Sequence, residues 1–249
     1  MKKLLFILLF LPVFIYAQDT PLIEQKVTTE KMEKEDQKKK IKQVFSFSQS
    51  INEVDASGKK QGIWTKTYNN GNVRYKGQFK DDKPQGLFYY YYSSGELQAE
   101  KEFFHNGVAA ATHIFYENGK LKAAGLYVNE LKDSTWHYFS VDSVLMMSEQ
   151  YQKGKLNGVT KTYYYTGELY EIKNWTQGVE NGSWIQYFIN GATKMDILIN
   201  HGVREGKIVY YFPSGKVYYN GSYLADNKSG IWEYFTEEGV SDTIINYNE

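Results

Sequence analysis

The chain has 249 residues with 29 basic and 29 acidic side chains, so its formal charge of zero gives no general attraction to nucleic acid or to an anionic membrane. It contains no cysteine, which excludes disulfide bonds, thiolate metal sites and cysteine nucleophiles. Aromatic residues make up 17% of the chain, including 23 tyrosines. This composition favours β structure, because aromatic side chains fit a pleated, half-buried surface.

The first 17 residues have the pattern of a secretory signal peptide. Lys2 and Lys3 form a basic start, and residues 4–16 are an apolar run that is too short to span a bilayer comfortably. Ala17 is a small residue that suits a cleavage point. We therefore expect residues 1–17 to be removed and the protein to be exported, to the periplasm, the cell surface or the medium. An uncleaved N-terminal anchor is the alternative.

Two segments separate this signal from the body of the chain. Residues 18–43 are polar and highly charged, with almost no large apolar side chain. Pairs such as Glu30 and Lys34 could support a short helix, but a segment that cannot bury an apolar face is more typical of a solvated linker. Residues 44–61 end in a turn-rich run and are interpreted as a degenerate first repeat or cap.

The body of the chain, residues 62–249, repeats every 24 residues without an insertion or deletion. Two columns of small residues define the register. The first column begins the copies at Gly62, Gly86, Ala110, Ser134, Gly158, Gly182, Gly206 and Gly230. The second column lies nine residues further on, at Gly71, Gly95, Gly119, Ser143, Gly167, Gly191, Gly215 and Gly239. A constant period over eight copies indicates tandem supersecondary units.

Each copy is predicted to form a β-hairpin. An aromatic-rich run such as Ile63–Tyr68 is expected to be the first strand. A tight turn follows at Gly71, because glycine adopts positive φ at low cost and Asn-Gly between aromatic or β-branched runs favours a hairpin. After the second strand, a longer polar loop such as Lys80–Gln85 is expected to return the chain to the next small residue. No helical stripe is sustained.

The predicted fold is therefore all-β, an elongated single-layer antiparallel sheet of about eight tandem 24-residue hairpins. A single hairpin is marginal in water, so neighbours must pair edge to edge and bury their aromatic columns together. Sixteen strands at about 4.8 Å each would extend on the order of 75 Å. We expect one packed, concave face and one partly wet face.

The sequence also resembles a known repeat family. Tyr75–Phe79 and Tyr219–Tyr223 are similar to the Tyr-x-Gly-x-aromatic core of MORN (membrane occupation and recognition nexus) repeats. The whole pattern over residues 62–249 is similar to the MORN variant repeats of bacterial YwqK-type proteins, which are often labelled antitoxins. The resemblance implies an elongated antiparallel single-layer sheet, and this family has no catalytic residues to carry over.

The sequence shows no catalytic or metal-binding constellation. His113 and His137 occupy the same position in consecutive copies, about 10 Å apart in such a sheet, which is too far to share a zinc ion without other ligands. Carboxylates such as Asp81 and Asp82 fall in turns, where no cleft would hold them for acid–base chemistry. We predict no catalytic residue, no metal, no cofactor and no enzymatic activity.

The aromatic columns are the one feature that could serve binding. Four tryptophans share one position, two residues after the start of their copies: Trp64, Trp136, Trp184 and Trp232. They are either the core of a thin sheet or a recognition strip on its open face.

The leading hypothesis is an exported, non-catalytic scaffold that binds an unidentified protein, or a glycan, at the bacterial envelope. The alternatives are a structural element associated with the membrane surface or cell wall, and an antitoxin-like immunity protein. No nucleic-acid partner is expected, and the oligomeric state is left open.

Overall fold

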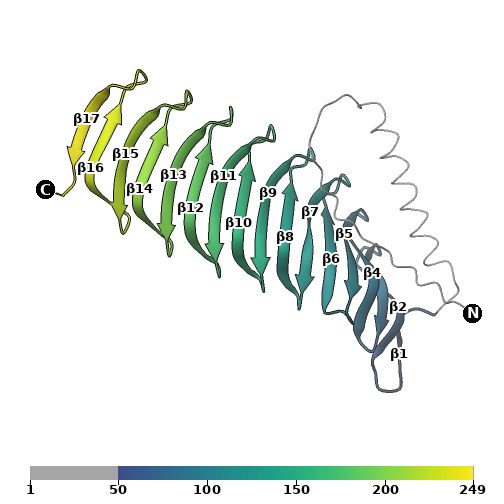
Figure 1. Cartoon of the computed structure of the whole chain (residues 1–249). Helices are drawn as coiled ribbons and strands as arrows, with labels where there is room; N and C mark the ends of the chain where they lie inside the picture. Colours follow the sequence, from purple (N-terminus) through teal and green to yellow (C-terminus); the bar gives the residue numbers. More distant parts are fainter. Residues whose placement is uncertain (1–49, 249) are drawn as a thin grey trace, which may run out of the picture. The chain divides into compact units, whose positions relative to one another are not determined.

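The computed structural model describes residues 50–248, so the predicted signal peptide, the predicted linker and residues 44–49 of the predicted cap lie outside the described residues. Every regular element of the described part is a β-strand, and all the strands belong to one sheet (Figure 1). Each strand pairs antiparallel with the strands before and after it in the chain. The predicted all-β, elongated, single-layer sheet is confirmed.

The strands are β1 (Glu53–Val54), β2 (Lys60–Thr67), β3 (Val73–Lys80), β4 (Lys83–Tyr91), β5 (Leu97–Phe104), β6 (Ala109–Phe115), β7 (Leu121–Val128), β8 (Leu131–Phe139), β9 (Leu145–Gln152), β10 (Lys155–Tyr163), β11 (Leu169–Thr176), β12 (Val179–Tyr187), β13 (Thr193–Asn200), β14 (Val203–Tyr211), β15 (Val217–Leu224), β16 (Asn227–Phe235) and β17 (Ser241–Asn246). From β2 onward they form one hairpin per copy, β2–β3 first and β16–β17 last.

The short strand β1 extends the sheet by one strand before the first copy. It pairs with β2 through a turn that Asp55 closes. The Asp55 carboxylate accepts hydrogen bonds from the Ser57 hydroxyl (2.7 Å) and from the backbone N–H of Lys59 (3.0 Å). These hydrogen bonds, that of the Ser57 hydroxyl first, hold the pKa of Asp55 well below its usual range.

The turn inside each copy lies at the second column of small residues. In the first copy, Gly71 donates its N–H to the carbonyl of Tyr68 (3.0 Å), and Tyr68 donates to the carbonyl of Asn72 (2.8 Å). Gly71 has φ of 86°, a left-handed conformation that glycine adopts without a Cβ penalty. The equivalent glycines also have positive φ: Gly95, Gly119, Gly167, Gly191, Gly215 and Gly239. Ser143 occupies this place in the fourth copy, with φ of 70°.

The first column of small residues does not mark chain reversals. The prediction of a longer polar loop at Lys80–Gln85 is wrong. Strands β3 and β4 are joined by the two residues Asp81 and Asp82, whose φ values are 52° and 65°. A two-residue hairpin turn of this kind needs positive φ at both positions, which aspartate tolerates. Gly86 lies inside β4, next to a register shift against β3 that marks a β-bulge. Ala110 replaces it in the third copy, where β5 and β6 pair without a shift.

Tyrosine hydroxyls join consecutive copies near the turns. The Tyr116 hydroxyl donates to the carbonyl of Phe139 in the next copy at 2.8 Å. Equivalent bonds run from Tyr68 to Tyr91, from Tyr92 to Phe115, and from Tyr164 to Tyr187. Each adds a link between hairpins beyond the strand pairing.

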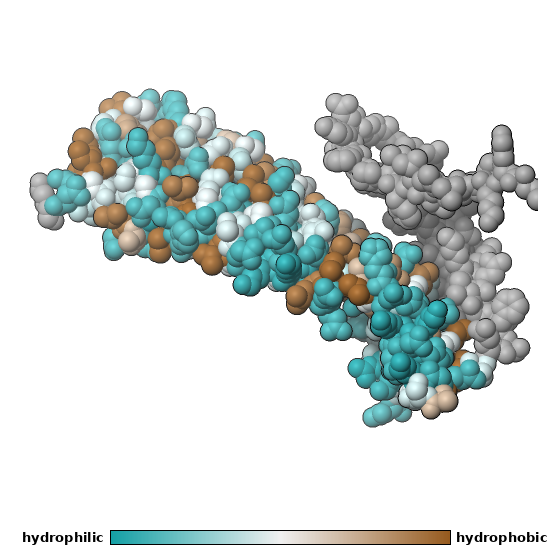
Figure 2. Space-filling model, turned by 60° about the horizontal axis from the view of Figure 1, so that its bottom comes forward, coloured by the Kyte–Doolittle hydropathy of each residue, from teal (hydrophilic) through white to brown (hydrophobic). Residues whose placement is uncertain are grey.

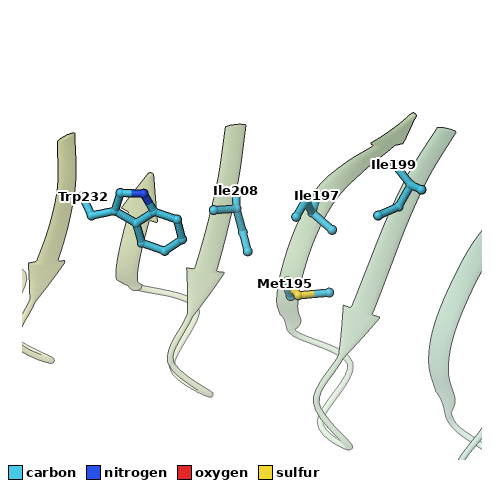
Figure 3. Close-up of a cluster of buried hydrophobic side chains, with 5 residues drawn as sticks. All are labelled: Met195, Ile197, Ile199, Ile208 and Trp232. Carbon is cyan, nitrogen blue, oxygen red and sulfur yellow. The ribbon is translucent and has the colours of Figure 1, made fainter. Parts of the chain in front are cut away.

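Most of the buried side chains lie on one face of the sheet, which we call the ring face. Five positions of each copy contribute to it. Counted from the first small residue of the copy, they are the second, fourth, thirteenth, fifteenth and seventeenth residues after it. Figure 3 shows part of it: Met195, Ile197 and Ile199 of β13, with Ile208 of β14 and Trp232 of β16, all buried.

The opposite face, which we call the outer face, is wetter. Leu198, which lies between Ile197 and Ile199 on β13, is 49% exposed, whereas Ile197 is 2% exposed. This alternation is expected where one face of a sheet is packed and the other is solvated. On the side of the molecule seen in Figure 2, hydrophobic residues are scattered among hydrophilic ones along the sheet.

Candidate functional site

The three largest fully buried side chains of the ring face lie directly against a glycine of the preceding strand. Trp136 is 1% exposed, and a Cβ built on Gly125 would lie 2.3 Å from its indole. No real Cβ makes a contact that short, so only glycine leaves room for the ring. Three such pairs occur among the described residues: Gly77 with Phe88, Gly125 with Trp136, and Gly221 with Trp232.

The four tryptophans predicted as a possible binding face share the ring face. Trp136 and Trp232 are 1% exposed, while Trp64 and Trp184 are half-buried. Each indole N–H has an acceptor; that of Trp136, for example, donates to the carbonyl of Leu126 at 3.0 Å. Trp136 and Trp232 are therefore core residues. A partner on this face would meet the side chains that lie over them.

Basic side chains cover these rings in several copies. In the fourth copy, the Lys132 ammonium lies 5.0 Å from the ring centroid of Trp136 and 4.9 Å from that of Tyr151. It also donates a hydrogen bond to the Tyr138 hydroxyl at 2.7 Å. Burial raises the pKa of Tyr151 to about 12. The eighth copy repeats this arrangement with Lys228, Trp232, Tyr234 and Tyr247.

We call these arrangements aromatic cages, and the chain fills them with its own cations. The residue two before the start of a copy is basic in four of the eight copies: Lys60, Lys132, Arg204 and Lys228. Arg204 lies 4.2 Å from the ring centroid of Tyr223 and pairs with Asp226 at 2.9 Å. This column was not predicted from the sequence, although its basic residues recur at multiples of the 24-residue period.

The second and third copies lack this basic residue. Pro84 and Val108 stand in its place, and Thr112 stands where five of the other copies have a tryptophan or phenylalanine. A hollow of about 540 Å³ opens here on the ring face, and Pro84 and Val108 help to line it. Its aromatic lining comes from Phe79, Phe88, Tyr90, Phe103 and Tyr127.

Lys101 of β5 lies in this hollow. Its ammonium is 4.7 Å from the ring centroid of Tyr127 and 5.6 Å from that of Tyr90. Burial lowers the pKa of Lys101, and the nearby negative charge of Glu130, which also lines the hollow, opposes that shift. Within residues 50–248, no carboxylate lies within 4.0 Å of this ammonium and no oxygen accepts a hydrogen bond from it, in contrast to Lys132.

The described residues hold no metal site and no membrane-spanning helix. Among the described residues, no three histidine, aspartate or glutamate side chains come close enough together to hold a metal ion. His113 and His137 lie on the outer face, at equivalent places in β6 and β8. No helix within residues 50–248 is long and apolar enough to cross a membrane.

Comparison with known families agrees with the hairpin register. A family model described as MORN repeat variant matches residues 60–81, 84–108, 114–129 and 204–225. Four repeats of the chain thus match the MORN repeat variant model. The first match spans the hairpin β2–β3, and the second spans β4–β5 apart from Lys83. The glycine beneath a ring at Gly77 lies within the first of them.

No curated protein matches this chain. Among solved structures, TarM is similar at 14% identity and a TM-score of 0.24, over 46% of this chain and 18% of that one. A GtfA/B complex bound to UDP and GlcNAc is similar at 15% identity and a TM-score of 0.21, over 43% and 21%. TcdB2-TccC3 is similar at 10% identity and a TM-score of 0.20, over 79% and 13%. The matched region is thus a small part of each of these chains, and scores this low carry no argument about function.

Proposed function

We propose that the protein is an exported, non-catalytic scaffold that binds a partner protein through its ring face at the bacterial envelope. The observation that carries this proposal is the layer of tyrosine hydroxyls and lysine ammonium groups over buried indoles, as in Lys132, Tyr138 and Tyr151. Each hairpin pairs with its neighbours, so this layer is held in place before any partner arrives.

The chemistry of the ring face favours a protein partner over a glycan. Tyrosine and lysine each combine an apolar body with a polar tip, and tyrosine is frequent in protein interfaces for that reason. A sugar would instead need free aromatic faces to stack on. In the filled cages those faces are already covered by cations, as Lys228 covers Trp232 at 4.2 Å.

The export part of the proposal is supported by the basic and apolar pattern of residues 1–17. Intact-mass measurement of the protein in the envelope and culture-medium fractions tests it. We expect a mature chain that begins at Gln18. A full-length chain beginning at Met1 and confined to the cytosol would contradict export.

Two adjacent residues of β10 provide a matched test of the binding face. Thr162 lies on the ring face and is half-buried, whereas Lys161 lies on the outer face and is exposed. A detergent extract of the envelope is passed over the wild-type protein, Thr162→Glu and Lys161→Glu. We expect the wild type and Lys161→Glu to retain one specific protein and Thr162→Glu to lose it, with all three showing similar thermal melting.

Two results would contradict this proposal. One is equal retention of the protein by both variants, which would move the contact away from the ring face. The other is retention of lipid vesicles of the organism's own phospholipids with no protein partner, which would favour a structural element at the membrane surface.

A further inference from the structure

The hollow in the second and third copies is a site of a different kind from the filled cages. Its volume of about 540 Å³ falls within the range of about 300–1,000 Å³ that is typical of small-molecule sites. We propose that it binds a small molecule with one carboxylate joined to an apolar or aromatic group, and that Lys101 is the cation that holds the carboxylate. This role is separate from protein binding by the rest of the ring face.

The floor and wall of the hollow suit the apolar part of such a ligand. Phe88 is 2% exposed, and its ring meets those of Phe79 and Phe103 edge to face, with centroids 5.1 Å and 5.0 Å away. Ala110, a small residue that is 3% exposed, also lines the hollow. An aromatic ligand would therefore meet rings already fixed in position by their neighbours.

Lys101 defines the charge of the ligand. In the fourth and eighth copies, the ammonium groups of Lys132 and Lys228 each donate to two tyrosine hydroxyls. Lys173 is paired with Glu180 at 3.4 Å. Lys101 is equally placed over rings but has no acceptor among residues 50–248, although its N–H groups lie in the hollow.

Burial disfavours the charge of this ammonium, and no group within residues 50–248 offsets that cost by accepting a hydrogen bond from it. A ligand carboxylate would supply the missing acceptors through charge-assisted hydrogen bonds. A neutral ligand of the same shape would not supply the Lys101 ammonium with a charged acceptor. The hollow should therefore discriminate strongly between a carboxylate and its amide.

Glu130 limits the ligand to a single negative charge. It lies in the two-residue turn between β7 and β8, with φ of 64°, and lines the rim of the hollow. Its carboxylate would repel a second anionic group on the ligand. A monocarboxylate fits this pair of charges better than a phosphate ester or a dicarboxylate.

Three probes of one shape test the proposal by protein-observed NMR titration: 3-phenylpropionate, its amide 3-phenylpropionamide, and the amine 3-phenylpropylamine. We expect the carboxylate to bind wild-type protein at least about tenfold more tightly than the amide or the amine. Glu130→Gln should tighten binding of the carboxylate about two- to fivefold, since it removes the opposing charge.

Lys101→Met should bind the carboxylate about tenfold more weakly, no better than the amide. Lys122→Met is the matched control, because Lys122 also lies over a tyrosine ring, Tyr116 at 5.4 Å, but outside the hollow. This control should keep wild-type affinity, and thermal melting reports whether either variant is misfolded.

The proposal is overturned if wild-type protein prefers the amide or the amine, if Lys101→Met retains the preference for carboxylate, or if no probe binds at about 10 mM. The wild-type comparison of the three probes stands even if Lys101→Met fails to fold. The face test with Thr162 and Lys161 does not involve Lys101, so failure of this site and failure of the protein-binding proposal are distinguishable.

Discussion

The indole of Trp136 packs on the backbone of Gly125, so closely that a Cβ on the glycine would lie 2.3 Å from the ring. At the boundary with the next copy, the same two positions hold a different pair of residues. There Glu149 replaces the glycine, and Thr160 replaces the tryptophan opposite it in the register. At both of these boundaries the facing side chains are matched in size, so one of them cannot be altered without regard to the other.

Gly125→Ala is expected to lower the free energy of unfolding by about 1–3 kcal/mol, because its methyl group must displace the buried indole of Trp136. Urea denaturation measures the effect. In a Trp136→Thr background, which copies the arrangement at Thr160, the same substitution should cost much less. Equal costs in the two backgrounds would contradict the contact.

Tyr116→Phe is expected to cost about 1 kcal/mol, because it removes a part-buried hydrogen bond of 2.8 Å to the carbonyl of Phe139. Phe188 occupies the equivalent position in the sixth copy without a hydroxyl. Phe188→Tyr should therefore raise the melting temperature by forming the bond that the sixth copy lacks. If both substitutions leave the melting temperature unchanged, the hydroxyl row does not hold the copies together.

Gly167→Val is expected to destabilise its hairpin by about 1–2 kcal/mol. No atom lies within 4 Å of a Cβ at this position, so the cost comes from φ of 103°, which a β-branched residue tolerates poorly. Ser143 holds the equivalent turn with φ of 70°, and Ser143→Gly should change stability by less than about 0.5 kcal/mol. Unchanged melting of Gly167→Val would contradict this origin of the cost.

Stability should fall at alkaline pH. Burial raises the pKa of Tyr90 to about 12, and burial likewise raises that of Tyr219 to about 12, above the ordinary value of 10.0. A raised pKa in the folded state means that the neutral phenol is favoured there. The stabilisation is therefore complete below about pH 10 and is lost as the pH rises toward 12.

Urea midpoints measured between about pH 9 and pH 12 test this dependence. The midpoint of the wild type should decline steadily across this range, and that of Tyr90→Phe should decline less steeply. A variant that follows the wild-type curve throughout would show that Tyr90 does not contribute to the alkaline loss of stability.

The 24-residue period was sufficient to predict the hairpin count, the single sheet and the turns at positions such as Gly71, because positive φ leaves a glycine signature. The two-residue turn between β3 and β4 was missed for a physical reason. At Asp81 and Asp82 the left-handed conformation is adopted without glycine, and the flanking polar residues looked like a loop. Gly86 has the same positive φ but serves a bulge within a strand.

The binding features were harder to predict, since they depend on which rings a cation covers. Trp136 could be placed on one face from its position in the repeat, but its burial depends on Gly125, which belongs to the preceding hairpin. Lys101 carries no motif at all. Its place over Tyr127 follows from Thr112 opposite it, whose small side chain leaves the space.

The most direct test of the central claim, that the ring face binds a partner protein, is site-specific photo-crosslinking in intact cells. A benzoylphenylalanine residue is placed at Thr162 in one strain and at Lys161 in another, on opposite faces of the same strand. The proposed function predicts a crosslinked protein partner from position 162 and none from position 161. A crosslink from position 161 alone, or equal crosslinks from both positions, would contradict it.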